Sequence, residues 1–133
     1  VYTKDEGSNN CDDIDVAYVY VPKSDQATSN APKIVAPGDE WTFNAILPNI
    51  KTWSARHKTL FKKTDLTIDD YTAVKDAFDL KKIFDEASGV GSTGLSGLTN
   101  PNAAGSIISA MTEDGHYALI HYVRVAGWSN EMN

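Results

Sequence analysis

The sequence predicts an α+β domain in which one antiparallel sheet, formed by N-terminal strands and a C-terminal hairpin, packs against two or three central helices. Three observations support this fold. Strand-like runs lie near both ends of the chain, apolar residues recur at helical spacing between residues 50 and 87, and a glycine-rich stretch separates the two patterns. The length of 133 residues fits one core, so we expect residues 1–133 to form a single domain.

The N-terminal region predicts an acidic arm followed by a strand. The first fifteen residues carry five carboxylates against one lysine, and we expect residues 1–13 to form the arm. The run from Ile14 to Val21 is rich in β-branched residues and tyrosine, and it is apolar on both alternating faces from Val16 onward. Two apolar faces are typical of a strand inside a sheet, so this run predicts a central strand.

A hairpin is predicted after a polar loop over residues 23–32. Its first strand covers residues 33–36, and Pro37 and Gly38 fit the two central positions of a type II turn. The return strand places four apolar side chains on one face, namely Trp41, Phe43, Ala45 and Leu47. Such alternation predicts a strand that buries one side only.

The central region predicts helices. A first helix over residues 50–63 is indicated by Asn49, which is placed to cap it, and by apolar residues at helical spacing, namely Ile50, Trp53, Leu60 and Phe61. A second helix is predicted after Thr67, because Thr67 and Asp70 match a capping box. Its expected buried stripe consists of Ile68, Tyr71, Val74 and Phe78.

The apolar phase of this second helix breaks near Asp79. A new stripe lies about half a turn round the helix, and it consists of Leu80, Ile83, Phe84 and Ala87. We therefore expect a kink or a restart near Asp79, and we expect Gly89 to end the helix.

Residues 89–105 predict a long glycine-rich loop. Residues 89–94 match the pattern G-x-G-x-x-G, but a helix rather than a strand precedes them, so a mobile or interface loop is the better interpretation. Beyond the loop, residues 106–113 and 116–125 predict a hairpin around Asp114 and Gly115. This pair is favoured in tight turns whose two residues both have positive φ.

The candidate catalytic and metal-binding residues do not form a known motif. His57, His116 and His121 are too dispersed to converge on an ion, so we predict no metal and no cofactor. The single cysteine, Cys11, excludes a disulfide within the chain, and its acidic neighbours disfavour the reactive thiolate. A small enzyme with its site near the C-terminal hairpin and the glycine loop, using His116 and His121, stays open as a third hypothesis.

The charge pattern carries the leading hypothesis. A net charge of −6 disfavours nucleic-acid binding, yet one short stretch holds five of the twelve cations and no acid. These cations are predicted interface or anion-binding residues, namely Lys51, Arg56, Lys58, Lys62 and Lys63. Unless acidic and basic patches neutralise each other within one chain, they meet between copies and generate rings or filaments. We therefore expect a non-enzymatic structural subunit of a coat, filament or other homo-oligomer.

The second hypothesis is a secreted or surface binding module for a carbohydrate or a protein receptor. Its possible ligand-binding residues are Tyr18, Tyr20, His116 and Trp128. The longest apolar run is far shorter than a membrane span requires, so we expect no span. The leading two hypotheses favour an extracellular or virion-like location over the cytoplasm.

Overall fold

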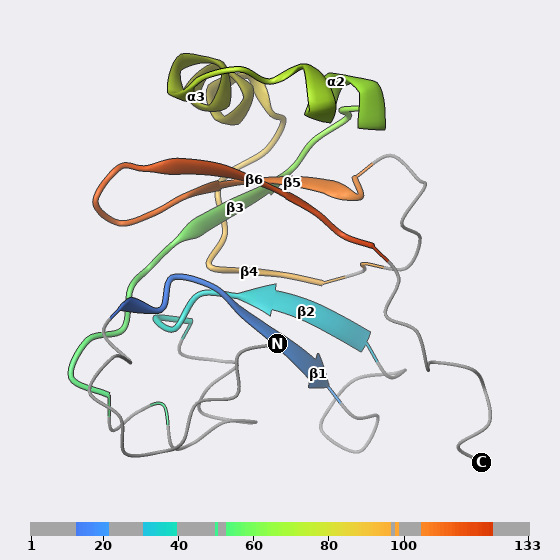
Figure 1. Cartoon of the computed structure of the whole chain (residues 1–133). Coiled ribbons are helices and arrows are strands. Elements are labelled where there is room, and N and C mark those ends of the chain that lie inside the picture. Colours follow the sequence, from blue (N-terminus) through green and yellow to red (C-terminus); the bar gives the residue numbers. More distant parts are fainter. Residues whose placement is uncertain are drawn as a thin grey trace, which may run out of the picture.

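The computed structural model describes residues 13–21, 31–39, 50, 53–96, 98 and 105–123 (Figure 1). Within these ranges it contains six strands and two helices. They are β1 (Ala17–Val21), β2 (Ala31–Val35), β3 (Leu60–Lys63), α2 (Ile68–Ala73), α3 (Ala77–Glu86), β4 (Gly94–Leu95), β5 (Ile107–Met111) and β6 (Tyr117–His121). The mixed α+β class is confirmed. The expectation of one sheet is wrong, because the strands form two antiparallel three-stranded sheets, ordered β1-β2-β4 and β3-β5-β6.

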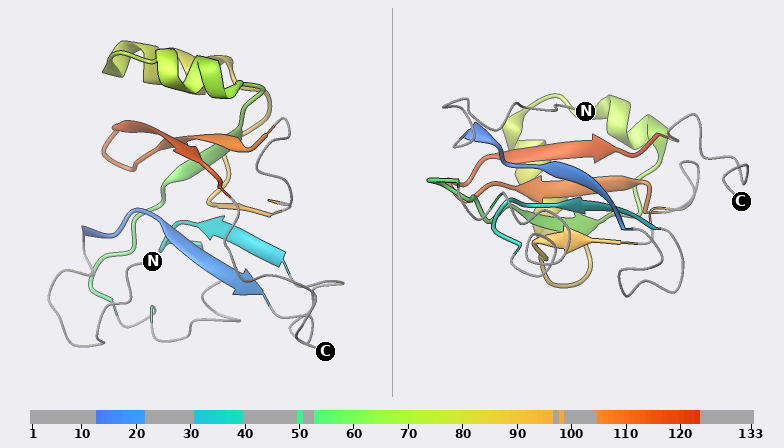
Figure 2. Two further views of the ribbon diagram at one scale, coloured as in Figure 1. Left: turned by 45° about the vertical axis from the view of Figure 1, so that its right-hand side comes forward. Right: turned by 90° about the horizontal axis from the view of Figure 1, so that it is seen from below.

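A short stretch around β4 connects the two sheets. Ser92 and Phe61 exchange backbone hydrogen bonds of 2.8 and 3.0 Å next to β3, and the Ala36 N–H donates to the Thr93 carbonyl at 2.8 Å next to β2. The β3-β5-β6 sheet lies between the helices and the β1-β2-β4 sheet, as the views in Figures 1 and 2 show. The glycine-rich stretch is therefore not irregular throughout, because it contributes β4; Gly97 and residues 99–104 lie outside the described ranges.

The main core lies between the two sheets. Ile34 on β2 faces residues of the other sheet, and the buried members of this cluster are Ile34, Ala36, Phe61, Leu98, Ile108 and Ala110. Neighbouring residues of a strand point to opposite faces, so Val35 joins a second cluster with Val19 and Ile50. The β1-β2-β4 sheet is thus apolar on both of its faces.

The helices cover the other face of the β3-β5-β6 sheet. The buried Phe84 of α3 packs edge-to-face on Tyr117 of β6 with ring centroids 5.8 Å apart, and the Tyr71 ring of α2 lies 5.7 Å from that of His121. We call residues 65–87 the helix layer; they comprise α2, α3, the link between them and the residues that flank the two helices. This layer lies on one outer side of the fold (Figure 2).

The predicted helix over residues 50–63 is wrong. Side chains from Ser54 to Lys58 alternate between exposed and half-buried, Thr59 is buried, and the chain then enters β3. Phe61 pairs with Ala110 of β5, which places its ring in the core and Lys62 on the opposite face. Strand pairing satisfies the backbone here, and tertiary pairing overrides a weak helical period.

The capping box that starts α2 is confirmed. Thr67 Oγ1 accepts from the Asp70 N–H at 3.2 Å, and Asp70 Oδ2 accepts from the Thr67 N–H at 2.8 Å. The restart is also confirmed, three residues before the expected position, since Asp76 caps α3. The predicted burial of Ile68 and Phe78 is wrong, because their side chains are 44% and 74% exposed.

The N-terminal strands β1 and β2 form an antiparallel pair. Among the described strands β1 pairs only with β2, and its central position stays a prediction because the expected return strand is not among them. A turn does follow β2, since the Asp39 N–H donates to the Ala36 carbonyl at 3.0 Å, but Gly38 lacks the positive φ that a type II turn requires. The expected return strand over residues 41–47 and residues 1–12 of the acidic arm lie outside the described residues.

The C-terminal hairpin is confirmed, with a wider turn than predicted. The Thr112 N–H donates to the His116 carbonyl at 2.8 Å, and the Gly115 N–H donates to the Thr112 carbonyl at 3.0 Å. Three residues therefore form the loop, and Gly115 occupies its left-handed position with φ of +86°. This is the common hairpin loop that combines a type I turn with a left-handed glycine.

Candidate interaction surface on the helix layer

The five predicted interface cations do not form one patch. Arg56 and Lys58 are exposed on the extended segment before β3, Lys63 is exposed at the end of β3, and Lys51 lies outside the described residues. Lys62 points the other way, toward the helix layer. Of the four cations that the structure describes, Arg56 and Lys58 lie together, on one side of the same extended segment.

Lys62 is bound to the end of α3. Its Nζ donates to the carbonyl oxygens of Phe84 and Ala87 at 3.0 and 3.3 Å, and it lies 4.8 Å from the centroid of the Phe84 ring. Cations stabilise the C-terminal end of a helix, where backbone carbonyls lack partners. This lysine therefore connects the helix layer to β3.

Of the four predicted ligand-binding residues, the structure describes the side chains of two, and they lie on different sheets. Tyr18 is 37% exposed on β1, and His116 is exposed in the β5–β6 turn of the other sheet. The backbone of Tyr20 belongs to β1 but its side chain is not described, and Trp128 lies outside the described residues. A common binding surface formed by these four residues therefore stays a prediction.

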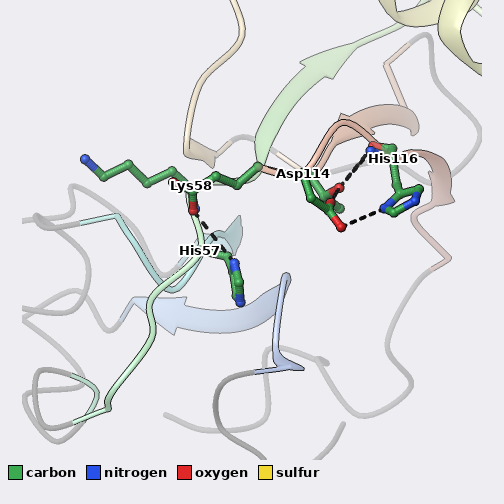
Figure 3. Close-up of polar contacts among 6 residues, drawn as sticks. His57, Lys58, Asp114 and His116 are labelled. Carbon is green, nitrogen blue, oxygen red and sulfur yellow. Dashed lines mark hydrogen bonds and ion pairs between the residues drawn. The ribbon is translucent and has the colours of Figure 1, made fainter.

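The β5–β6 turn holds a compact polar cluster (Figure 3). Asp114 lies 2.8 Å from His116 Nδ1 and accepts a hydrogen bond from Thr112 Oγ1. The Thr112 hydrogen bond, followed by the charge of His116, lowers the pKa of the Asp114 carboxyl. These contacts hold the carboxylate in its ionised form and fix the turn.

Glu113 connects this turn to the segment before β3. Its Oε2 accepts from the Lys58 N–H at 3.2 Å and lies 3.7 Å from His57 Nδ1. No group of three histidine, cysteine, aspartate or glutamate side chains in the described ranges is arranged to hold a metal ion. The carboxylates of the turn therefore serve contacts within the fold.

The outer surface of the helix layer combines negative charge with exposed apolar side chains. Residues 65–79 carry five aspartates and one lysine. Farther along, Lys81 and Lys82 form ion pairs with Asp85 and Glu86, so the excess negative charge is concentrated before that point. Phe78 and Ile68 are the exposed large apolar residues of this surface, and Phe78 is the more exposed of the two.

Helix capping explains part of this charge. Asp70 belongs to the capping box of α2, and its pKa is lowered by the hydrogen bonds from the backbone and side chain of Thr67. Asp76 caps α3 by accepting from the Asp79 N–H at 2.9 Å, and Asp79 accepts from the Lys75 N–H at 3.2 Å. Anions are favoured at helix N-termini. Capping does not explain the exposure of Phe78.

Phe78 is the functional candidate that the sequence pattern missed. Its spacing predicts a place in the buried stripe of the helix after Thr67, but the restart of the helix at Ala77 changes the phase. The buried or half-buried apolar residues of α3 and its C-cap are Leu80, Ile83, Phe84 and Ala87, whereas Phe78 is exposed. The break in periodicity near Asp79 was the signal that this residue belongs to neither stripe.

Comparison with protein-family models, with curated proteins and with solved structures finds no match to this chain. None of the helices in the described residues combines the length and the apolar character that crossing a bilayer demands.

Proposed function

We propose that this protein is a non-enzymatic structural subunit that assembles with copies of itself, and that the helix layer provides one contact surface. The observation that supports the proposal is the exposure of Phe78, whose side chain is 74% exposed between Asp76 and Asp79. Aromatic residues are enriched in the centres of protein interfaces, while charged residues are typical of the rim. Phe78 and its acidic neighbours fit that arrangement.

Burial of Phe78 in a contact between subunits would be energetically favourable. Full burial of a phenylalanine side chain contributes about 2 kcal/mol. The isolated chain forgoes most of this contribution. Capping by Asp76 does not explain an aromatic residue at position 78, because the side chain at that position takes no part in the cap. A contact between subunits recovers it, because the ring is removed from water in the assembly.

The polar cluster of the β5–β6 turn supports a structural role for the other candidate residues. His116 is paired with Asp114, and His57 lies beside Glu113. These side chains bring the turn and the segment before β3 together. The third hypothesis, a small enzyme, places His116 and His121 at its site. His116 has the contacts of a turn-forming residue, whereas His121 on β6 has a buried Nε2 without a hydrogen-bond partner among the described residues.

Light scattering over a concentration series tests the proposal. We expect the wild-type chain to show a mass above that of one chain that rises with concentration, and Phe78→Ser to shift the mass toward the monomer. Val90→Ser is the matched control, because Val90 is 93% exposed outside the helix layer and should leave the mass unchanged. Circular dichroism verifies that each variant is folded.

A wild-type chain that stays monomeric at every concentration would overturn the proposal. The binding-module hypothesis would then be preferred, with the same surface receiving a protein receptor. Equal loss of assembly in Phe78→Ser and Val90→Ser would also count against a specific contact at the helix layer.

A further inference from the structure

We infer that the helix layer of one subunit docks on the segment 54–58 of the next copy, where Arg56 and Lys58 receive its negative charge. This inference rests on the proposed self-assembly, and it identifies the second contact surface. We call residues 54–58 the basic segment.

The basic segment presents its two cations on one side. Ser54, Arg56 and Lys58 are exposed, whereas Ala55 and His57 are half-buried. This alternation is that of an extended chain, in which every second side chain points the same way. The Arg56 and Lys58 side chains therefore project from the same side into solvent.

Contacts with two other elements fix the position of the basic segment. The Gly38 N–H donates to the His57 carbonyl at 2.8 Å, and the Lys58 N–H donates to Glu113 at 3.2 Å. The turn after β2 packs so closely that a Cβ on Gly38 would lie 2.6 Å from Lys58 Cγ and 3.0 Å from the Arg56 carbonyl oxygen. A preorganised surface of this kind loses little conformational entropy on binding.

Among the described residues, the two carboxylates of the β5–β6 turn have partners other than the Lys58 ammonium. Glu113 faces His57 and the backbone of Lys58, while Asp114 is paired with His116. Figure 3 shows the Lys58 side chain extending away from the Asp114–His116 pair. The charge of the ammonium is therefore directed to the surroundings rather than to this pair.

The two surfaces lie on different sides of the fold. The helix layer lies beyond the β3-β5-β6 sheet, whereas the chain before β3 runs along the side of the fold toward β1 and β2 (Figures 1 and 2). They are unable to meet within one chain. Complementary patches on different sides of a subunit define a heterologous contact, which produces a ring if it closes and a filament if it does not.

Charge complementarity supports a second copy as the occupant. Residues 65–79 carry five aspartates against Lys75 alone, and the basic segment carries two cations and no acid. Opposite charges at the rim of an interface set its orientation and accelerate encounter, and their effect decreases with added salt. We expect assembly to weaken as the ionic strength rises.

Complementary charge reversal tests the inference. One variant combines Asp65→Lys with Asp69→Lys, at exposed positions that cap neither helix. The other combines Arg56→Glu with Lys58→Glu. We expect each variant alone to lose at least about tenfold in association constant, because the first removes the net negative charge of residues 65–79 and the second opposes two negative surfaces. An equimolar mixture should regain association, because the unchanged helix layer of one variant meets the unchanged basic segment of the other.

Single reversals provide the matched control. Arg56→Glu and Lys63→Glu change the net charge equally, but Lys63 lies at the opposite end of β3. We expect Arg56→Glu to weaken assembly and Lys63→Glu to leave it unchanged, with circular dichroism showing that both fold.

The outcomes separate this inference from the proposed function. If Phe78→Ser dissociates the assembly while the Arg56 and Lys58 double variant assembles like the wild type, the helix layer contacts another surface and the inference is wrong. If the two charge-reversed variants remain apart on mixing, the inference is also wrong. If the wild type never assembles, the proposed function fails with it.

Discussion

The ammonium of Lys62 lies 3.0 Å from the carbonyl oxygen of Phe84 and 4.8 Å from the centroid of the same residue's ring. A single side chain of β3 thus contacts both the backbone end and the buried aromatic of α3. Since Phe84 also packs on Tyr117, the three residues connect the helix layer to both outer strands of the β3-β5-β6 sheet.

Replacing Lys62 with methionine should loosen the helix layer. The substitution keeps most of the apolar stem but removes the charge and both donors to the end of α3. Hydrogen bonds to charged groups contribute more than neutral ones, so we expect a loss of about 1 to 2 kcal/mol in the free energy of unfolding. Urea denaturation measures it. Lys63→Met, at an exposed neighbouring position, should change stability by less than about 0.5 kcal/mol. Equal effects at both positions would contradict the bridging role.

Ser109→Ala should be neutral or stabilising. Ser109 is fully buried on β5, and its Oγ has no hydrogen-bond partner among the described residues. A buried hydroxyl without a partner carries an uncompensated desolvation cost, so its removal should raise the urea midpoint or leave it unchanged. The reverse change at the next residue, Ala110→Ser, introduces a hydroxyl into the main core and should cost about 1 to 3 kcal/mol. A clear loss of stability in Ser109→Ala would show that its hydroxyl has a partner after all.

Local signals in the sequence were sufficient for the features that depend on neighbouring residues. Thr67 and Asp70 predicted the start of α2, because a capping box is complete within one helical turn. Asp114 and Gly115 predicted the C-terminal hairpin. The expected two-residue turn requires positive φ at both residues, whereas the observed three-residue loop requires it only at Gly115.

Features that depend on distant partners were not predictable in this way. Leu60 and Phe61 fit a helical stripe and a strand equally well, and the choice is made by β5, in which Met111 and Ala110 pair with them. The candidate contact surface on the helix layer was likewise only partly predictable from the sequence. Its negative charge is visible in the sequence, but the exposure of Phe78 depends on where α3 restarts and how that helix packs on β6.

Asp70→Asn should reduce the acid sensitivity of the helix layer. Hydrogen bonds from Thr67 lower the pKa of Asp70 below its ordinary value of 3.8 in the folded state. The stabilisation is therefore complete above the unfolded-state pKa and is lost as the pH falls through the lower folded-state pKa. Asp70→Asn should be less stable than the wild type near neutral pH, and the difference should disappear in acid. Urea midpoints of both proteins across this pH range provide the measurement, and a difference that is independent of pH would exclude the carboxylate as its source.

Gly115→Ala should destabilise the β5–β6 hairpin, whereas Gly115→Asn should be tolerated better. Gly115 has φ of +86°, and no atom lies within 4 Å of the position of an added Cβ, so backbone conformation rather than crowding determines the cost. Left-handed backbone costs an alanine about 1 kcal/mol, while asparagine adopts it more readily. We expect the urea midpoint to decrease in the order glycine, asparagine, alanine at position 115.

The same substitutions should affect assembly. Since the turn carries Glu113, which contacts the basic segment, Gly115→Ala should weaken assembly more than Gly115→Asn does. Equal stability of the alanine and asparagine variants would show that this turn relaxes to another conformation.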